Sequence, residues 1–413
     1  MHCAGNHTLV GAFLVAVICG CSSQSTTLPG GGAGSVASSG GGSGGATGSS
    51  GNAGSSGGSA SGSGSASGGN GSSGSGSASG GSGGSSGSAN RGGDGGLQTY
   101  PPLTSSAVSA LQAVLVPGQF YFTEGPVWDP KKNVLYFTDI QAHQGTQNVG
   151  AIYRLTLPNQ IDALLEPDGN TDGIGLDPQG NIIAAGFASR EVWRLSNGIM
   201  QPLATCSSSA STTCYNGQEV NTPDDITSRA DGIIYFTDPT FGSGLGLPNQ
   251  TFVLGSAQGV YRLTQDGALH VEDTSTQGPN GVNLSPDQTT LYVAYTLGGS
   301  VAKFDVQPDG SLKNKQTFAT GTTLADSMCV DHGGNVYVGT YSGLAVFNPA
   351  GQALGTVAAG GQIVTNCAFG GADQKTLFIT ARAQSTLTGT PAMGNGFLYK
   401  VDSMPVPGIP GQN

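Results

Sequence analysis

Short runs of alternating or continuous apolar residues fill the chain after about residue 97, and turns rich in Gly, Asp, Asn and Pro separate them. This pattern predicts short β-strands and almost no long amphipathic helix. Six stretches repeat one another as a strand, a turn and a second strand: TEGPVWDPKKNVLYFTD, TDGIGLDPQGNIIAAG, PDDITSRADGIIYFTD, PNGVNLSPDQTTLYVAY, ADSMCVDHGGNVYVGT and TNCAFGGADQKTLFITA. A third strand follows, as in AIYRLT, EVWRLS and GVYRLT.

The repeats recur about every 50 residues, which is the spacing of propeller blades. We therefore predict an all-β fold, a six-bladed β-propeller, over residues 98–413. The segment AVSALQAVLVPGQF, residues 107–120, precedes the first repeat. We expect it to supply the strand that completes the last blade, because closing the circle hides exposed strand edges.

One polar residue leads the first strand of every repeat. Aligned on their turns, the repeats place in this column Glu124, Asp172, Asp224, Asn280, Asp326 and Asn366. A column that recurs with the period of a propeller becomes a ring around its axis, and carboxylate and amide oxygens are ligands for a hard cation. The alternative is that Asp and Asn simply favour local turns. That alternative explains Glu124 poorly, because Glu is not a turn former.

Four motifs carry a resemblance to a known family: FTEGPVWDPKKNVLYFTDI, NTPDDITSRADGIIYFTDPTFG, GPNGVNLSPDQTTLYVAYT and TNCAFGGADQKTLFITA. Together they resemble the gluconolactonase and regucalcin (senescence marker protein) family of six-bladed propellers, over residues 118–402. The resemblance implies one divalent cation, with calcium expected first and magnesium, zinc or manganese as alternatives. It places the metal ligands at Glu124, Asn280 and Asp326, and the catalytic proton acceptor and donor at Asp326.

The expected substrate-binding residues are Asp224, Asp172 and His143. Asp224 lies in PDD, where the family has a PND-type motif, so an amide is replaced by an acid. The added charge would tighten cation binding or repel an acidic product. The following Asp225 is expected to orient the loop. His143, in QAHQGTQ, is expected near the channel mouth, with a solvated loop position as the alternative.

The predicted function is metal-dependent hydrolysis of sugar lactones, in which the cation activates carbonyl and water and Asp326 moves protons. A carboxylate that binds the cation directly is a weak base, so Asp326 either uses its second oxygen or only steers the attacking water. The alternative function is a non-enzymatic tethered propeller that binds a glycan or protein and keeps a structural cation. A serine hydrolase is not supported, because GxSxG occurs only within the Gly/Ser-rich segment.

The N-terminus predicts export. Residues 1–21 contain the apolar run LVGAFLVAVI and end in CGC. With the following Ser22 and Ser23 this reads CGCSS, which resembles a bacterial lipoprotein processing site with Cys21 as the lipidated residue, although no Lys or Arg precedes the run. Residues 22–97 are almost entirely Gly, Ser and Ala, which predicts a disordered linker. We expect a cell-envelope lipoprotein, in the outer membrane or periplasm, or a secreted protein.

The remaining expectations concern charge and cysteine. The net charge of -11 disfavours nucleic acid and anionic membranes as partners. The family resemblance implies a small-molecule lactone as the substrate. We also expect a monomer, and membrane contact only through a lipid on Cys21. Cys206 and Cys214 bracket a polar loop and are expected to pair. Cys329 and Cys367 are expected to be buried apolar thiols rather than a catalytic pair.

Overall fold

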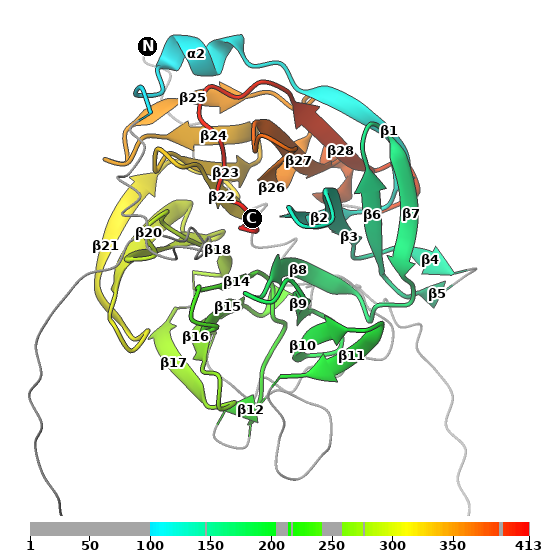
Figure 1. Ribbon diagram of the computed structural model, residues 1–413, viewed down its shortest axis with the longest axis vertical. Coiled ribbons are helices and arrows are strands. Elements are labelled where there is room, and N and C mark those ends of the chain that lie inside the picture. Colours follow the sequence, from blue (N-terminus) through cyan, green and yellow to red (C-terminus); the bar gives the residue numbers. More distant parts are fainter. Residues whose placement is uncertain are drawn as a thin grey trace, which may run out of the picture. The chain divides into compact units, whose positions relative to one another are not determined.

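Six four-stranded antiparallel sheets are arranged around a central axis in the computed structural model (Figure 1). The structure describes residues 100–144, 147–203, 214–215, 218–241, 258–275, 277–387 and 391–412, without the side chains of 143–148 and 214–219. The predicted signal segment 1–21 and linker 22–97 lie outside these ranges. The all-β, six-bladed propeller is confirmed.

Each blade runs from an inner strand to an outer one. From the axis outward the blades are β2 (Thr123–Asp129), β3 (Val134–Asp139), β6 (Ala151–Thr156), β7 (Gln160–Leu165); β8 (Thr171–Leu176), β9 (Ile182–Gly186), β10 (Glu191–Ser196), β11 (Ile199–Pro202); β14 (Ile226–Ser228), β15 (Ile234–Asp238), β16 (Gly259–Leu263), β17 (Leu269–Thr274); β18 (Pro279–Leu284), β19 (Thr290–Tyr295), β20 (Ser300–Val306), β21 (Leu312–Thr320); β22 (Met328–Val330), β23 (Val336–Thr340), β24 (Gly343–Phe347), β25 (Ala353–Val357); and β26 (Ile363–Gly370), β27 (Thr376–Arg382), β28 (Gly396–Val401), β1 (Val114–Phe120). Two short hairpins, β4 (His143–Gln144) with β5 (Gln147–Asn148) and β12 (Cys214–Tyr215) with β13 (Gln218–Glu219), lie outside the blades.

The circle closes by the expected route. Strand β1 pairs antiparallel with β28, with Val116 opposite Leu398, so the outer strand of the last blade comes from the start of the domain. The segment 107–120 is not all strand, however: its first residues belong to helix α2 (Ser105–Ala110), where the Thr104 side chain caps Ala107 N. The sequence SSAVSA contains no Gly or Asn, and Thr104 caps its first turn. These features favour a short helix over an edge strand.

Adjacent blades pack through apolar side chains. The ring of Trp128 in the first blade stacks on Phe378 in the last at a centroid distance of 5.8 Å, and both are fully buried. Phe137 of the first blade also meets Phe120, in the outer strand of the last blade, edge to face at 5.2 Å. Such contacts bury the apolar residues that the sequence pattern placed along the strands.

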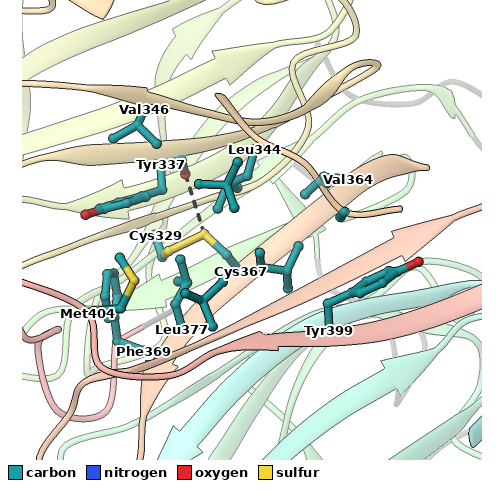
Figure 2. Packing of buried hydrophobic residues seen from close by; sticks show 14 of the residues in the cluster. Cys329, Tyr337, Leu344, Val346, Val364, Cys367, Phe369, Leu377, Tyr399 and Met404 are labelled. Carbon is teal, nitrogen blue, oxygen red and sulfur yellow. Dashed lines mark hydrogen bonds between the residues drawn. A yellow bond between two sulfur atoms is a disulfide. The ribbon is translucent and has the colours of Figure 1, made fainter. Parts of the chain in front are cut away.

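Cys329 and Cys367 correct one expectation. Both are buried, as predicted, but they form a disulfide with a Cα–Cα distance of 5.5 Å and are not free thiols (Figure 2). The inner strands β22 and β26 are neighbours near the axis, so residues 38 apart in sequence come within bonding distance. Cys206 lies outside the described residues, and the side chain of Cys214 is not described, so the expected pairing of these two cysteines stays a prediction.

The C-terminal segment crosses the turns at the far end of the inner strands. His332 N donates to Pro407 O at 2.9 Å, Gly408 N to Gln374 O at 2.8 Å and Met404 N to Lys375 O at 2.8 Å. Met404 and Val406 of this segment are buried. Within the described ranges, no helix has the length and apolar character needed to span a membrane.

Candidate active site

The predicted column becomes a ring at one end of the channel. Glu124, Asp172, Asn280 and Asn366 lie in the inner strands β2, β8, β18 and β26, and Asp224 and Asp326 lie just before β14 and β22. The carboxylates of Glu124, Asp172, Asp224 and Asp326 act on one another electrostatically. The structure therefore brings together four acids that are about 200 residues apart along the chain at the extremes.

Glycines after the ring residues bring successive blades together. A Cβ at Gly125 would lie 2.6 Å from Asp172 O, one at Gly173 would lie 2.7 Å from Asp224 O, and one at Gly281 would lie 2.6 Å from Asp326 O. Real side chains do not approach a backbone oxygen so closely, so only glycine permits this spacing. The EG, DG and NG pairs of the sequence thus set the width of the ring.

The repeated tripeptide FTD ends the second strand of the first and third blades, and its threonine supports the ring residue of the next blade. Thr138 Oγ1 donates to Asp172 O at 2.8 Å, and Thr237 Oγ1 donates to Asn280 O. Each FTD threonine therefore holds the main chain of a ring residue in the next blade. These threonines were not predicted, but the repetition of FTD in the first and third repeats was a usable signal.

The aspartates of the same tripeptide hold the loops that lead into the ring. Asp139 accepts hydrogen bonds from Tyr121 N and Phe122 N, both at 2.8 Å. Asp238 accepts from Asn221 N at 2.9 Å and Thr222 N at 2.8 Å. Carboxylates that accept two backbone N–H groups are strong anchors.

Burial dominates the protonation of the ring acids. It raises the pKa of Glu124 well above the usual range, and the charges of Asp326 and Asp172 raise it further. Burial likewise raises the pKa of Asp172 and of Asp224 well above the usual range, with a contribution from neighbouring carboxylates. Close like charges in a desolvated site cannot all ionise without a compensating positive charge.

Asp326 has both a positive charge and a side-chain hydrogen bond beside it, whereas Asp172 has, of these two, the charge of Arg382 alone. Burial raises the pKa of Asp326, while the positive charge of Arg382 and a hydrogen bond with the Asn280 side chain oppose that rise. Ser327 Oγ donates to Asn280 Oδ1 at 3.4 Å. The two residues that the sequence paired as metal ligands, Asn280 and Asp326, are thus in contact across adjacent blades.

Arg382, at the end of β27, was not predicted. Its guanidinium lies over the Phe122 ring at 4.7 Å, and its Nη1 donates to Thr386 Oγ1 at 2.9 Å. Burial lowers its pKa, and the charges of Asp326, Glu124 and Asp172 raise it. Composition gave no reason to single out this arginine, but it directly follows ITA in the sixth repeat.

Comparison with known proteins now decides the family. Residues 122–383 match the SMP-30/Gluconolactonase/LRE-like region, which is more than half of the chain. The chain belongs to this family. A gluconolactonase of Zymomonas mobilis is 28% identical over 306 residues, covering 68% of this chain and 82% of the relative. Regucalcin of Gallus gallus is 23% identical over 299 residues, covering 70% and 92%.

Solved structures agree with the fold of this SMP-30/gluconolactonase family member. A gluconolactonase of Xanthomonas campestris superposes with a TM-score of 0.60 at 28% identity, covering 75% of this chain and 95% of that one. A calcium-binding regucalcin of Agrobacterium tumefaciens gives 0.56 at 16% identity, covering 73% and 96%, and shows the fold alone.

The donor chemistry of the ring suits the cation that the SMP-30/gluconolactonase family implies. Glu124, Asn280 and Asp326 offer only oxygen ligands, which calcium and magnesium prefer. Burial and, to a lesser degree, the neighbouring carboxylates raise the pKa values of Glu124, Asp172 and Asp224, so a positive charge at the ring would favour their ionised forms. Within the described ranges, no three His, Cys, Asp or Glu side chains are grouped closely enough to hold a metal ion by themselves.

Two predicted site residues differ in how far the structure defines them. Asp172, in β8, is 7% exposed and belongs to the ring. His143 belongs to strand β4, but its side chain is outside the described part, so its contact with substrate stays a prediction. His332 lies at the opposite end, stacked on Tyr100 at 5.9 Å.

Proposed function

We propose that this chain is a divalent-cation-dependent hydrolase that opens sugar lactones. The observation that carries the proposal is the ring of four acids, in which Glu124, Asp172 and Asp224 are buried and Asp326 is partly buried, with the Asn280 side chain hydrogen-bonded to Asp326. A ring of this composition concentrates negative charge where a cation and a polar substrate can be held. The similarity to gluconolactonases of Zymomonas mobilis and Xanthomonas campestris supports lactones as the substrate class. A pentonolactonase of Haloferax volcanii, 25% identical over 267 residues, supports the same class.

The cation would be held by Glu124, Asn280 and Asp326, with calcium as the expected ion. When bound, it would polarise the lactone carbonyl and make an attacking water more acidic. The carboxylates of Asp172 and Asp224 would then lie beside it, and their acceptor oxygens suit the hydroxyl groups of a sugar. We assign Asp172, Asp224 and His143 to substrate binding on this basis.

Asp326 would move the protons of the reaction. Water adds its oxygen to the carbonyl carbon, and Asp326 accepts the proton that the water loses. The bond between the carbonyl carbon and the ring oxygen then breaks, and the proton passes from Asp326 to that oxygen to give the hydroxy acid. Burial favours the protonated form of Asp326 and Arg382 opposes it, which suits a group that must both accept and donate a proton.

We also propose that the protein is exported and anchored through a lipid on Cys21, with residues 22–97 as a spacer. The disulfide between Cys329 and Cys367 supports an oxidising compartment, because such bonds rarely persist in the cytosol.

The test is hydrolysis of D-glucono-1,5-lactone by the full chain, measured with calcium and with EDTA. We expect EDTA to abolish turnover, and Asp326→Asn to lower kcat by about 10²- to 10⁴-fold, the usual contribution of a general acid or base. Asp373→Asn, in an exposed turn at the far end of β26, is the matched control. Calcium-dependent thermal stabilisation without turnover of any lactone would instead favour the non-enzymatic propeller.

A further inference from the structure

The last blade gives the ring hydrogen-bond donors where the other blades give mostly acids. Asn366 in β26 is fully buried; its Oδ1 accepts from Cys367 N at 2.7 Å, and its Nδ2 has no partner. Arg382 at the end of β27 also has a buried donor, Nε, without a partner. The proton transfers proposed above use neither residue.

A network of threonines sets these donors beside the first blade. Thr123 Oγ1 donates to Ala381 O at 2.9 Å and accepts from Ala381 N at 3.3 Å. Thr365 Oγ1 donates to Thr123 O at 2.8 Å. Glu124, Arg382 and Asn366 are the residues that directly follow Thr123, Ala381 and Thr365. The hydrogen bonds among Thr123, Ala381 and Thr365 therefore hold in place the main chain from which these three side chains extend.

The guanidinium of Arg382 is close enough to the ring acids to act on their charge, but its described contacts include no ion pair with them. Its charge acts on Asp326, Glu124 and Asp172, yet its described contacts are the Thr386 hydroxyl and the Phe122 ring. An arginine that is partly buried, stacked on a ring and not paired in a bidentate bridge keeps its planar donor edge for a ligand. An amide donor buried without a partner costs about 1–3 kcal/mol unless a ligand or water satisfies it.

We propose that Arg382 and Asn366 form a subsite for the carboxylate of a sugar acid. The subsite rests on the proposed function: negative charge develops on the carbonyl oxygen when water adds, and the product acid becomes a carboxylate once it loses its remaining proton to solvent water. Arg382 donates to the carbonyl oxygen throughout, and Asn366 donates through Nδ2. The four acids of the ring would repel an anionic product, so the donors of the last blade set the orientation in which it binds.

The experiment measures binding of sodium D-gluconate and of neutral sorbitol to the calcium-loaded full chain by calorimetry, together with lactone turnover. We expect the wild type to prefer gluconate. We expect Arg382→Gln to weaken gluconate binding at least about tenfold, to leave sorbitol binding unchanged, and to lower kcat about 10²-fold or more, as loss of an oxyanion donor does. Arg382→Lys keeps the charge but not the fork, and should recover part of the preference.

Asn366→Asp and Asn366→Ala test the second donor. The added charge of Asn366→Asp should weaken gluconate binding more than Asn366→Ala does, with sorbitol unaffected in both. The matched control is Arg154→Gln, which removes a solvent-facing ion pair with Asp162 on outer strands. A change in melting temperature identifies variants that do not fold, and Arg382→Lys then carries the comparison.

The outcomes separate the two proposals. If the wild type turns over lactone and Arg382→Gln and Arg382→Lys keep its preference for gluconate, the subsite is wrong and the hydrolase stands. If the wild type prefers gluconate but turns over no lactone, the hydrolase is wrong and the subsite stands. Equal binding of gluconate and sorbitol by the wild type would overturn the subsite.

Discussion

The carboxylate of Asp225 accepts a hydrogen bond from the backbone N–H of Val282 at 2.9 Å, across the boundary between the third and fourth blades. Its other oxygen accepts from Ile226 N at 2.9 Å, and burial raises its pKa to about 6. Asp225 thus joins the main chain next to Asp224 to the main chain next to Asn280. The orienting role expected for Asp225 is realised as a bridge between blades.

Asp225→Ala should therefore loosen the ring and destabilise the fold. Two buried N–H groups lose a charged acceptor, so we expect the free energy of unfolding to fall by about 2–4 kcal/mol and kcat/KM to fall with it. Urea unfolding and lactone kinetics measure the two effects. Asp309→Asn, in an exposed turn, should change neither quantity; an unaltered unfolding midpoint in Asp225→Ala would show that the bridge carries no stability.

The metal-free protein should become less stable as pH rises. A carboxyl group whose folded pKa exceeds its unfolded value binds protons on folding, so its stabilising contribution is present at low pH and is lost as pH rises through the folded pKa. For Asp225 that loss runs from the usual 3.8 to about 6, and Glu124, Asp172 and Asp224 share the sign.

Thermal melting in EDTA at about pH 5 and about pH 7.5 tests this linkage. We expect the higher melting temperature at the lower pH, and calcium should reduce the difference because it binds the ionised folded state. Asp225→Asn should flatten the profile near pH 6. A melting temperature in EDTA that rises with pH would contradict the assignment of excess charge to the ring.

Asp224→Asn restores the amide that the family motif carries at this position. Removing one buried negative charge should weaken calcium binding and strengthen binding of D-gluconate, each by about tenfold or less, as expected for one charge at partial screening. Calorimetry with each ligand separates the two effects. Weaker binding of both ligands would mean that Asp224 contacts substrate directly rather than acting through its charge.

Gly281→Ala tests whether glycine sets the spacing of the ring. A Cβ there would lie 2.5 Å from Ser327 Cα and 2.6 Å from Asp326 O, so the blades must separate. We expect a loss of about 1–3 kcal/mol in unfolding free energy and weaker calcium binding. Gly198→Ala is the control, because it has a left-handed backbone but nothing within 4 Å; it should lose stability without losing calcium affinity.

Replacing Cys329 and Cys367 together by alanine should destabilise the propeller by about 3–4 kcal/mol, from the loop entropy that the cross-link removes. Guanidinium unfolding with and without a reducing agent measures the effect in the wild type. If reduction leaves the unfolding curve of the wild type unchanged, the disulfide contributes nothing to stability.

Repetition made the fold predictable from the sequence. The six repeats gave the blade number, and the acids and amides leading them gave the ring, because position within a blade determines position around the axis. Closure by residues 107–120 followed from the need to cover the last blade. These features depend on local period and on one global symmetry, both of which are visible in a single chain.

What departs from that symmetry was not predictable. The Cys329–Cys367 bond depends on the distance between two inner strands, which no repeat spacing states. The repeats placed Asn366 in the ring but gave no sign of Arg382 beside it, because the hydrogen bonds of Thr123 and Thr365 that tie the first blade to the last leave no periodic trace. The helix Ser105–Ala110 begins after the capping Thr104, before the segment 107–120 that was expected to supply a strand, and it takes up the first residues of that segment.

The last blade takes its outer strand from residues 114–120 and its other three from residues 363–401. A nascent chain therefore holds an unmatched strand from the start of the domain until its last strands leave the ribosome. The ring can assemble only after synthesis of the domain is nearly complete, because the hydrogen bonds of Thr123 and Thr365, like the donors of Arg382 and Asn366, need the strands of the last blade. Premature termination would thus yield an open, aggregation-prone chain with exposed strand edges and no assembled active site, rather than a smaller enzyme.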